Sequence, residues 1–272
     1  MRMRGVLIGV AIGTTLGIAA SRIGRWRRTW GIDPAEATRA LPGDDIVAEP
    51  SAAETRGITI DAPIDAVWPW LVQMGYGRAG WYSYDQLDQR GRSADRIVDE
   101  WQALKVGDIV PTHPGGGFEV ARLEAGRALV LRSDTALVAA QAATAREGAA
   151  GLATATTGVR LSGAMLSGTP QEFAATWAFV LEPLDGGRTR LIERFRAWFS
   201  AEAPGAPLVM PLIGFGVFVM LQKQMVGIRE RAEGLARERT AKAALEATKP
   251  VGTRNGHGHR VEAKEVVAGP IG

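Results

Sequence analysis

Two long stretches in the second half of the chain, residues 173–185 and 188–200, constrain the fold more than any other feature. Both are rich in aromatic and aliphatic residues, and Gly186–Gly187 separates them. A glycine pair between two such runs predicts a β-hairpin. Side chains alternate between the faces of a strand, so one face of the second strand carries Leu191, Glu193, Phe195, Ala197 and Phe199. We expect this face to meet the core, with Glu193 as its polar exception.

The preceding part of the chain predicts further strands and an early helix. Residues 55–63 are rich in β-branched residues and stop at Pro63, which predicts a strand. The next segment places Ile64, Val67, Trp68, Leu71 and Met74 at helical spacing, so we predict an amphipathic helix. A short helix is predicted near residues 83–89, and three more strands are predicted at 106–111, 117–126 and 127–134.

A long helix is predicted at the end of the folded part, from Pro207 to Arg239. Its first portion, 208–221, is apolar and uncharged, and it turns amphipathic afterwards. Fourteen residues are short for a membrane span, which needs ~20. We therefore expect this portion to close over a sheet, the alternative being a segment that dips into the membrane.

Residues 135–170 are dominated by Ala, Gly, Thr and Ser. We interpret them as a low-complexity insertion, with a helical flap over 135–148. A segment of this length inside a domain is either disordered or a lid. Residues 241–272 are predicted to be a disordered tail.

The N-terminus predicts a membrane anchor. Residues 5–21 form a run of seventeen uncharged residues, Trp26 and Trp30 follow where an aromatic belt would lie, and residues 1–30 hold six arginines and no acid. A signal peptide cleaved near residues 19–21 and a buried or interfacial helix are the alternatives. The arginine cluster after the run disfavours cleavage. The positive-inside rule slightly favours a cytoplasmic location for the domain, in a protein of the cell membrane.

These features divide the chain into four parts: an anchor at 1–30, a linker at 31–53, a domain at 54–240 and a tail at 241–272. The strands and the terminal helix predict an α+β fold, in which one curved antiparallel sheet wraps a long C-terminal helix.

Composition excludes several functional classes. The absence of cysteine excludes disulfides, thiolate catalysis and Cys-ligated metals, and three histidines, two of them in the tail, are too few for a multi-His metal site. Residues 31–240 carry five more acidic than basic residues, so we expect no nucleic-acid partner. Because phosphate-binding, dinucleotide-binding and nucleophile-elbow motifs are absent from the sequence, we expect no cofactor.

Four segments resemble the SRPBCC superfamily, whose members have the START-like, helix-grip fold. They are ITIDAPIDAVWPWLVQMGYGRAGWYSYDQLD (58–88), SADRIVDEWQALKVGDIVP (93–111), WAFVLEPLDGGRTRLIERFR (177–196) and LQKQMVGIRERAE (221–233). The superfamily includes polyketide cyclases, lipid carriers and hormone-binding proteins. The resemblance implies a deep apolar cavity between the curved sheet and the long helix.

Eight residues are candidates for ligand binding because of their rings, their place in the strand alternation or their position on a helix. They are Trp68, Trp81, Tyr82, Tyr84, Trp177, Glu193, Phe195 and Phe215. Glu193, Tyr84 and Asp85 are the candidates for acid–base catalysis. A buried Glu193 would need a partner, for which Arg96 or a tyrosine hydroxyl could serve. We interpret His113 as a loop residue.

From these observations we expect a membrane-anchored domain that binds a hydrophobic small molecule or lipid in its central cavity, for transport or sequestration. Two alternatives stay open. One is an enzyme that resembles a polyketide cyclase or dehydratase and uses the same cavity. The other is a non-catalytic, membrane-tethered interaction module whose core is too tightly filled to admit a ligand.

Overall fold

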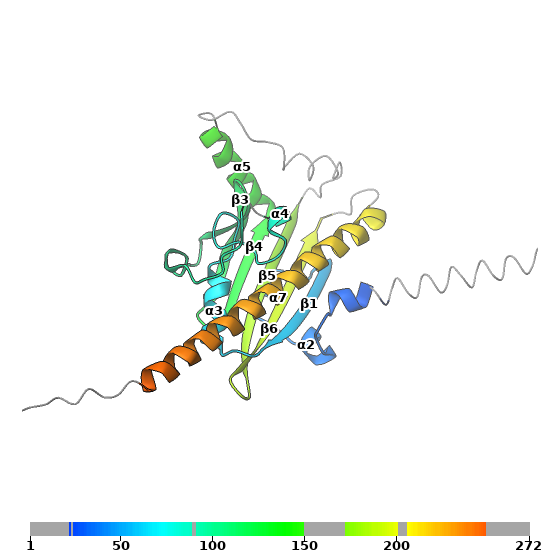
Figure 1. Cartoon of the computed structure of the whole chain (residues 1–272). Helices are drawn as coiled ribbons and strands as arrows, with labels where there is room; N and C mark the ends of the chain where they lie inside the picture. Colours follow the sequence, from blue (N-terminus) through cyan, green and yellow to red (C-terminus); the bar gives the residue numbers. More distant parts are fainter. Residues whose placement is uncertain (1–21, 23, 89–90, 150–171, 201–205, 249–272) are drawn as a thin grey trace, which may run out of the picture. The chain divides into compact units, whose positions relative to one another are not determined.

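One antiparallel sheet of six strands organises the chain (Figure 1). The structure is a computed structural model, and it describes residues 22, 24–88, 91–149, 172–200 and 206–248. The strand order is β1-β6-β5-β4-β3-β2, so the first and last strands of the sequence pair with each other. The strands are β1 (Ala52–Ile60), β2 (Ile109–His113), β3 (Gly116–Glu124), β4 (Ala128–Asp134), β5 (Phe173–Leu184) and β6 (Arg188–Phe199).

The predicted hairpin is formed by β5 and β6. Their register runs from Phe173 opposite Phe199 to Leu184 opposite Arg188. Gly186 and Gly187 have φ values of 76° and 69°, in the left-handed region that a tight hairpin turn requires. The alternation predicted for β6 is also present, since Leu191 and Glu193 are buried on the face toward the core.

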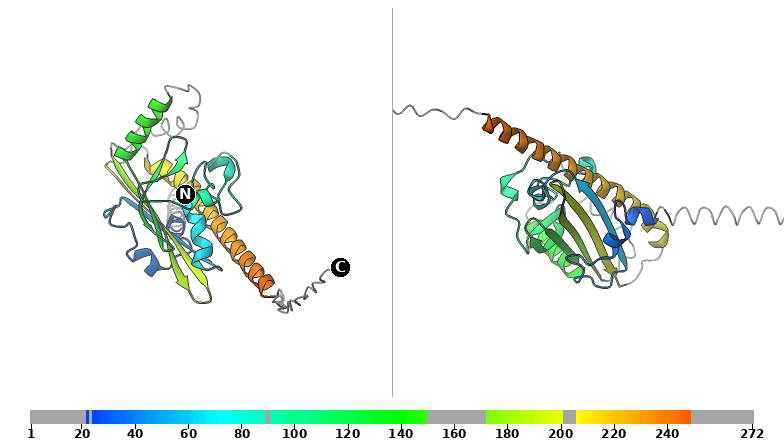
Figure 2. Two further views of the ribbon diagram at one scale, coloured as in Figure 1. Left: turned by 90° about the vertical axis from the view of Figure 1, so that its left-hand side faces the viewer. Right: turned by 90° about the horizontal axis from the view of Figure 1, so that it is seen from below.

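The helices lie between and after the strands. They are α2 (Pro34–Thr38), α3 (Ile64–Val72), α4 (Asp85–Asp88), a 3₁₀ turn at Asp99–Trp101, α5 (Thr135–Ala149) and α7 (Ala206–Ala247). Helix α7 is the predicted C-terminal helix, and it crosses one face of the curved sheet (Figures 1 and 2). The sheet and this helix confirm the predicted α+β, helix-grip architecture.

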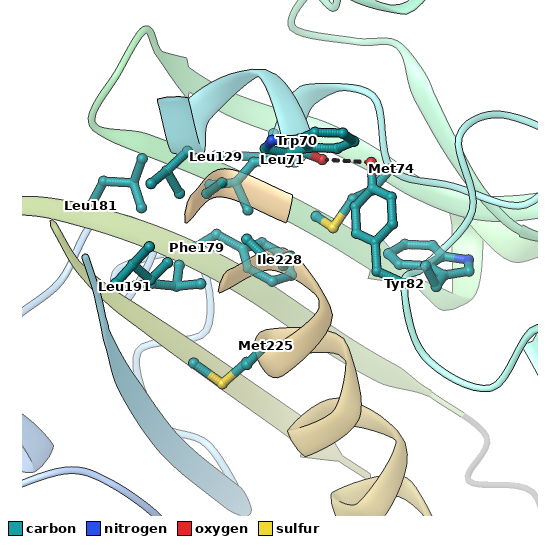
Figure 3. Close-up of a cluster of buried hydrophobic side chains, with 14 of the residues drawn as sticks. Trp70, Leu71, Met74, Tyr82, Leu129, Phe179, Leu181, Leu191, Met225 and Ile228 are labelled. Atoms are coloured by element: carbon teal, nitrogen blue, oxygen red, sulfur yellow. Dashed lines mark hydrogen bonds between the residues drawn. The ribbon is translucent and has the colours of Figure 1, made fainter. Parts of the chain in front are cut away.

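The main core lies between that face of the sheet, α3 and the middle of α7 (Figure 3). The sheet contributes alternate residues such as Leu129, Phe179 and Leu191, while α7 contributes Met225 and Ile228. Helix α3 adds one apolar side, which includes Trp70 and Leu71. A core built in this way fixes α7 over the centre of the sheet.

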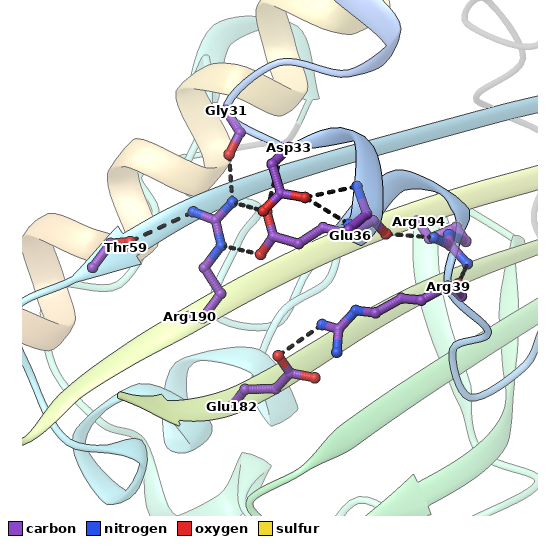
Figure 4. Close-up of polar contacts among 9 residues, drawn as sticks. Gly31, Asp33, Glu36, Arg39, Thr59, Glu182, Arg190 and Arg194 are labelled. Atoms are coloured by element: carbon purple, nitrogen blue, oxygen red, sulfur yellow. Dashed lines mark hydrogen bonds and ion pairs between the residues drawn. The ribbon is translucent and has the colours of Figure 1, made fainter. Parts of the chain in front are cut away.

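The opposite face of the sheet is covered by residues 31–48, part of the segment predicted as a linker. Three arginines of β6 hold this segment, and Figure 4 shows two of them, Arg190 and Arg194. Arg190 pairs with Glu36, Arg194 pairs with Asp44, and Arg196 donates to the Val47 carbonyl. Leu41 packs with Val180 and Ile192 in a second, smaller core. The segment therefore has structure of its own and contacts the sheet.

Other predictions fall partly outside the described residues. The apolar run 5–21 and most of the insertion and tail lie there, so the anchor, the lid and the disordered tail stay predictions. Within the described part, α5 forms where a helical flap was predicted, and α7 continues to Ala247, past the predicted start of the tail. Among the described helices, none is long and apolar enough to cross a membrane.

The chain divides into two compact units, Met1–Arg237 and Glu238–Gly272. The first contains the whole sheet and all the residues discussed below. In the second, the structure describes the end of α7 and Thr248.

Candidate functional site

Two buried charged residues stand opposite each other on the core side of the sheet. Arg56 on β1 and Glu193 on β6 are direct partners in the strand register. Both are fully buried. Strand alternation places them there, because Arg56 shares a face with Ile58 and Ile60 and Glu193 shares one with Leu191. Buried charges are rare unless they are paired or hydrogen-bonded, so this pair is the centre of the candidate site.

Glu193 is held by an aromatic neighbour. The indole nitrogen of Trp177 donates a hydrogen bond of 2.7 Å to Glu193 Oε1. Burial raises the pKa of the Glu193 carboxyl above its usual value, while the charge of Arg56 and the Trp177 hydrogen bond act in the opposite direction. The result is a carboxyl group that gains and loses its proton at a higher pH than an exposed glutamate.

Trp177 is itself the centre of a group of rings. Its ring stacks on Trp81 with centroids 5.2 Å apart, and Phe118 and Phe179 lie at 5.8 and 5.1 Å. These contacts fix the orientation of the indole that binds Glu193. They also give the surroundings of the carboxyl group an aromatic, apolar character.

Arg56 has different partners. Its Nη2 atom pairs with Glu54 on the same strand, and its Nε donates to the carbonyl of Arg27 at 3.2 Å. Arg27 also pairs with Glu54, at 3.3 Å. The guanidinium lies 5.6 Å from the ring centroid of Phe218 on α7. Arg56 thus links the N-terminal segment, β1 and α7.

Several polar atoms in this interior have no hydrogen-bond partner among the described residues. On the sheet they are Glu193 Oε2 and Arg56 Nη1, and on the helices they are Trp70 Nε1 and Gln224 Oε1. More than nine in ten buried polar groups in native proteins are paired. Unpaired atoms on facing elements therefore mark a place where a partner from outside the chain could bind.

Tyr82 is fixed between α3 and α7. Its hydroxyl donates to the carbonyl of Trp70 at 3.1 Å, and Arg231 lies over its ring at 4.7 Å. Its φ of 58° is in the left-handed region, which is unusual for a residue other than glycine. Burial raises its pKa. The contacts around Tyr82 hold a strained backbone in place, a feature that is enriched at functional sites.

The structure brings together part of the predicted site. Trp177 contacts both Trp81 and Glu193. Two more candidates, Trp68 and Phe195, are partly buried and pack against the same core. Tyr84 and Phe215 are exposed. The carboxylate of Asp85 accepts hydrogen bonds from the backbone and hydroxyl of Ser93, at 3.0 and 2.5 Å.

The predicted partner of Glu193 is not the one in the structure, so this prediction is wrong. We expected Arg96 or a tyrosine hydroxyl, but the carboxyl group interacts with Trp177 and Arg56. The side chain of Arg96 is exposed, and its carbonyl accepts a hydrogen bond from Gln73. Arg56 was missed by the sequence analysis, although alternation along residues 55–60 could have placed it beside Ile58 and Ile60.

Comparison with known proteins finds similar solved structures, while no family model and no curated protein matches the chain. A hypothetical protein of Helicobacter pylori has 15% identity and a TM-score of 0.38, with 71% of this chain and 95% of that chain covered. A polyketide-cyclase-like protein of Corynebacterium glutamicum has 16% identity and a TM-score of 0.24, with coverages of 73% and 96%.

A member of the major latex protein family from Arabidopsis thaliana has 11% identity and a TM-score of 0.25, with coverages of 63% and 93%. The strand order of the sheet and the long C-terminal helix across it establish the fold of this chain. It has the START-like, helix-grip fold. The helix-grip sheet presents Arg56 and Glu193 toward the helix it wraps, so the candidate site occupies the place where the resemblance implies a cavity.

Proposed function

We propose that this protein binds a hydrophobic small molecule or lipid between the curved sheet and α7. The observation that carries the proposal is the pair of unpaired buried atoms, Arg56 Nη1 and Glu193 Oε2, on adjacent strands. Leaving a buried donor or acceptor unpaired costs about 1–3 kcal/mol, and more for a charged group. A ligand that supplies the missing partners would offset that cost.

The chemistry around the pair defines the kind of ligand. Arg56 Nη1 can only donate, and an ionised Glu193 Oε2 can only accept. A hydroxyl or carboxamide group accepts from the first and donates to the second. The rings of Trp81, Trp177 and Phe118 offer apolar contacts to the rest of the molecule. We therefore propose a ligand with an apolar body and one neutral polar end.

The predicted anchor extends this proposal to the membrane. If residues 5–21 span the bilayer, the site stays beside the membrane, where lipid-like molecules concentrate. We propose transport or sequestration of such a molecule by a domain on the cytoplasmic side. The support for this part is the uncharged run in the sequence and the arginines that follow it.

A second function is favoured by the raised pKa of Glu193. A carboxyl group whose pKa is raised by burial holds its proton to a higher pH than an exposed one, and in that form it can act as a general acid toward a bound substrate. An enzyme that resembles a polyketide cyclase or dehydratase would use Glu193 in this way. Conversion of an identified ligand would distinguish this function from binding alone.

The test is native mass spectrometry of the full chain, followed by solvent extraction and identification of bound compounds. We expect a co-purifying apolar compound that displaces the fluorophore anilinonaphthalene sulfonate from the protein. Arg56→Met removes a hydrogen bond from a charged donor, which corresponds to about 10- to 100-fold weaker binding. Glu182→Gln changes an outer-face residue that pairs with Arg39, and it is the matched control. An empty protein with no displaceable probe binding would overturn the proposal.

A further inference from the structure

Large apolar side chains are exposed where the N-terminal segment meets α7. Trp26 is 52% exposed, Phe215 is 47% exposed and Val217 is 44% exposed. Trp26 and Phe215 both contact the buried Phe218, with ring centroids 5.2 and 6.2 Å from it. Figure 2 shows the helical turn 24–28 beside the first part of α7. Trp26 and Phe215 therefore form one patch around Phe218. Val217 follows Phe215 by two residues, so the helix places it on another side.

The patch is held firmly on the domain. The carbonyl of Trp30 accepts a hydrogen bond of 3.0 Å from Gly57 of β1, and the carbonyl of Arg27 accepts one from Arg56. The guanidinium of Arg27 lies against Gly214 of α7 and pairs with Glu54. The N-terminal segment is thus joined to both the sheet and the helix, so Trp26 has a fixed place beside Phe215.

The surroundings of the patch are basic. Arg22, Arg25 and Arg28 are exposed. Arg25 and Trp26 follow Arg22 by three and four residues, a spacing that places all three on one side of a helix. Residues 22–30 and 206–229 contain no acidic residue. Glu54, which lies beside this segment, is paired with Arg27 and Arg56.

We propose that this surface, the Trp26 face, docks onto an anionic lipid bilayer. It consists of Trp26, Phe215, Arg22, Arg25 and Arg28. Aromatic and aliphatic side chains beside exposed arginines match the boundary between acyl chains and acidic headgroups. In the sequence, the uncharged run 5–21 ends directly before Arg22, the first residue of the face. For this reason we propose a lipid bilayer as the binding partner of the face. This inference goes beyond ligand binding, because it concerns how the domain lies on a membrane.

The absence of cysteine allows a direct test on the full chain. Phe215→Cys is labelled with an environment-sensitive fluorophore, and the protein is mixed with or reconstituted into vesicles that contain phosphatidylglycerol. Val106→Cys is the matched control, because Val106 is 61% exposed and lies three residues before the start of β2, at the opposite edge of the sheet from β1. Circular dichroism checks that both variants keep the fold.

We expect the label at position 215 to shift to shorter wavelength and to be quenched by brominated acyl chains, while the label at 106 stays in water. Replacing Arg22, Arg25 and Arg28 by glutamine should weaken the signal, and each arginine contributes about fivefold to partitioning onto acidic membranes. If the protein floats with the vesicles but the label at 215 stays in water, the N-terminus is only a tether and the proposal is overturned. Absence of any vesicle binding also overturns it. Ligand extraction from the same protein tests the proposed function separately.

Discussion

Arg56 on β1 stands directly opposite Glu193 on β6, and each of the two is held by a different partner. Arg56 pairs with Glu54, while Glu193 accepts a hydrogen bond from Trp177. Each keeps one buried polar atom unpaired. Because Arg56 pairs with Glu54, the cost of burying the charge of Glu193 is only partly offset. Burial accordingly raises the pKa of the Glu193 carboxyl group.

The raised pKa of Glu193 predicts a specific pH dependence of stability. A carboxyl group whose folded pKa is raised contributes stability at low pH and loses it as the pH rises through the folded pKa. Glu193→Gln removes this loss, so we expect the free energy of unfolding of the variant to gain on wild type as the pH rises through the range above about 4, the ordinary pKa of a glutamate. Thermal unfolding of both proteins across this range measures the effect.

Glu36→Gln is the control of opposite sign. The hydrogen bond from Arg190 lowers the pKa of Glu36, so its contribution to stability is present at neutral pH and is lost as the pH falls. Curves of wild type and Glu193→Gln that stay parallel over the whole range would contradict the assignment of a raised pKa to Glu193.

The indole of Trp177 should stabilise the protein through its hydrogen bond to Glu193. Trp177→Phe removes the donor and leaves a buried carboxyl oxygen unpaired, which costs about 1–3 kcal/mol. Trp81→Phe removes the indole that stacks on Trp177 and serves as the comparison for lost ring area. We expect Trp177→Phe to lower the free energy of unfolding in urea by this additional amount. Equal losses in the two variants would show that the hydrogen bond contributes nothing.

The sequence predicts well what depends on local patterns. Gly186–Gly187 located the hairpin because a tight turn needs residues that tolerate positive φ. Alternation along β6 placed Glu193 on the core side, since neighbouring residues of a strand face opposite sides of a sheet. The spacing of Val67 and Leu71 located α3.

What the sequence leaves open depends on pairing between distant segments. Arg56 and Glu193 meet because β1 pairs with β6, and residues 57–192 separate these two positions. In the sequence Arg56 is an isolated arginine in a short strand, where a solvated side chain is the ordinary expectation. Residues 31–48 are rich in Pro, Gly and acids, a composition typical of a linker, and their attachment depends on arginines in β6.

Arg194 should be the main attachment of that segment. It is buried, and it donates to Asp44, to Thr55 and to the carbonyls of Glu36, Ala37 and Arg39. Arg194→Met leaves the partly buried carboxylate of Asp44 without its closest cation, and an unpaired group of this kind costs about 1–3 kcal/mol. We expect faster amide hydrogen exchange in residues 36–48.

Arg39→Met is the matched control, because Arg39 pairs with Glu182 on the surface. A surface ion pair contributes about 0–1 kcal/mol. Protection of residues 36–48 that is the same in Arg194→Met and wild type would show that the small core around Leu41 is sufficient to hold the segment.

The contact between α7 and Tyr82 requires a glycine. A Cβ atom at position 227 would overlap the carbonyl oxygen of Tyr82, whose backbone is already in the left-handed region. Gly227→Ala should therefore push α7 away from Tyr82 and lower the free energy of unfolding by about 1–3 kcal/mol, as overpacking does in other cores.

Gly234 provides the control, because it lies seven residues further along α7 and an added Cβ there meets nothing within 4 Å. Gly234→Ala should stabilise the helix by about 0.5–1 kcal/mol. Urea unfolding of the two variants measures both changes, and a Gly227→Ala protein as stable as Gly234→Ala would show that α7 is free to move off Tyr82 at no cost.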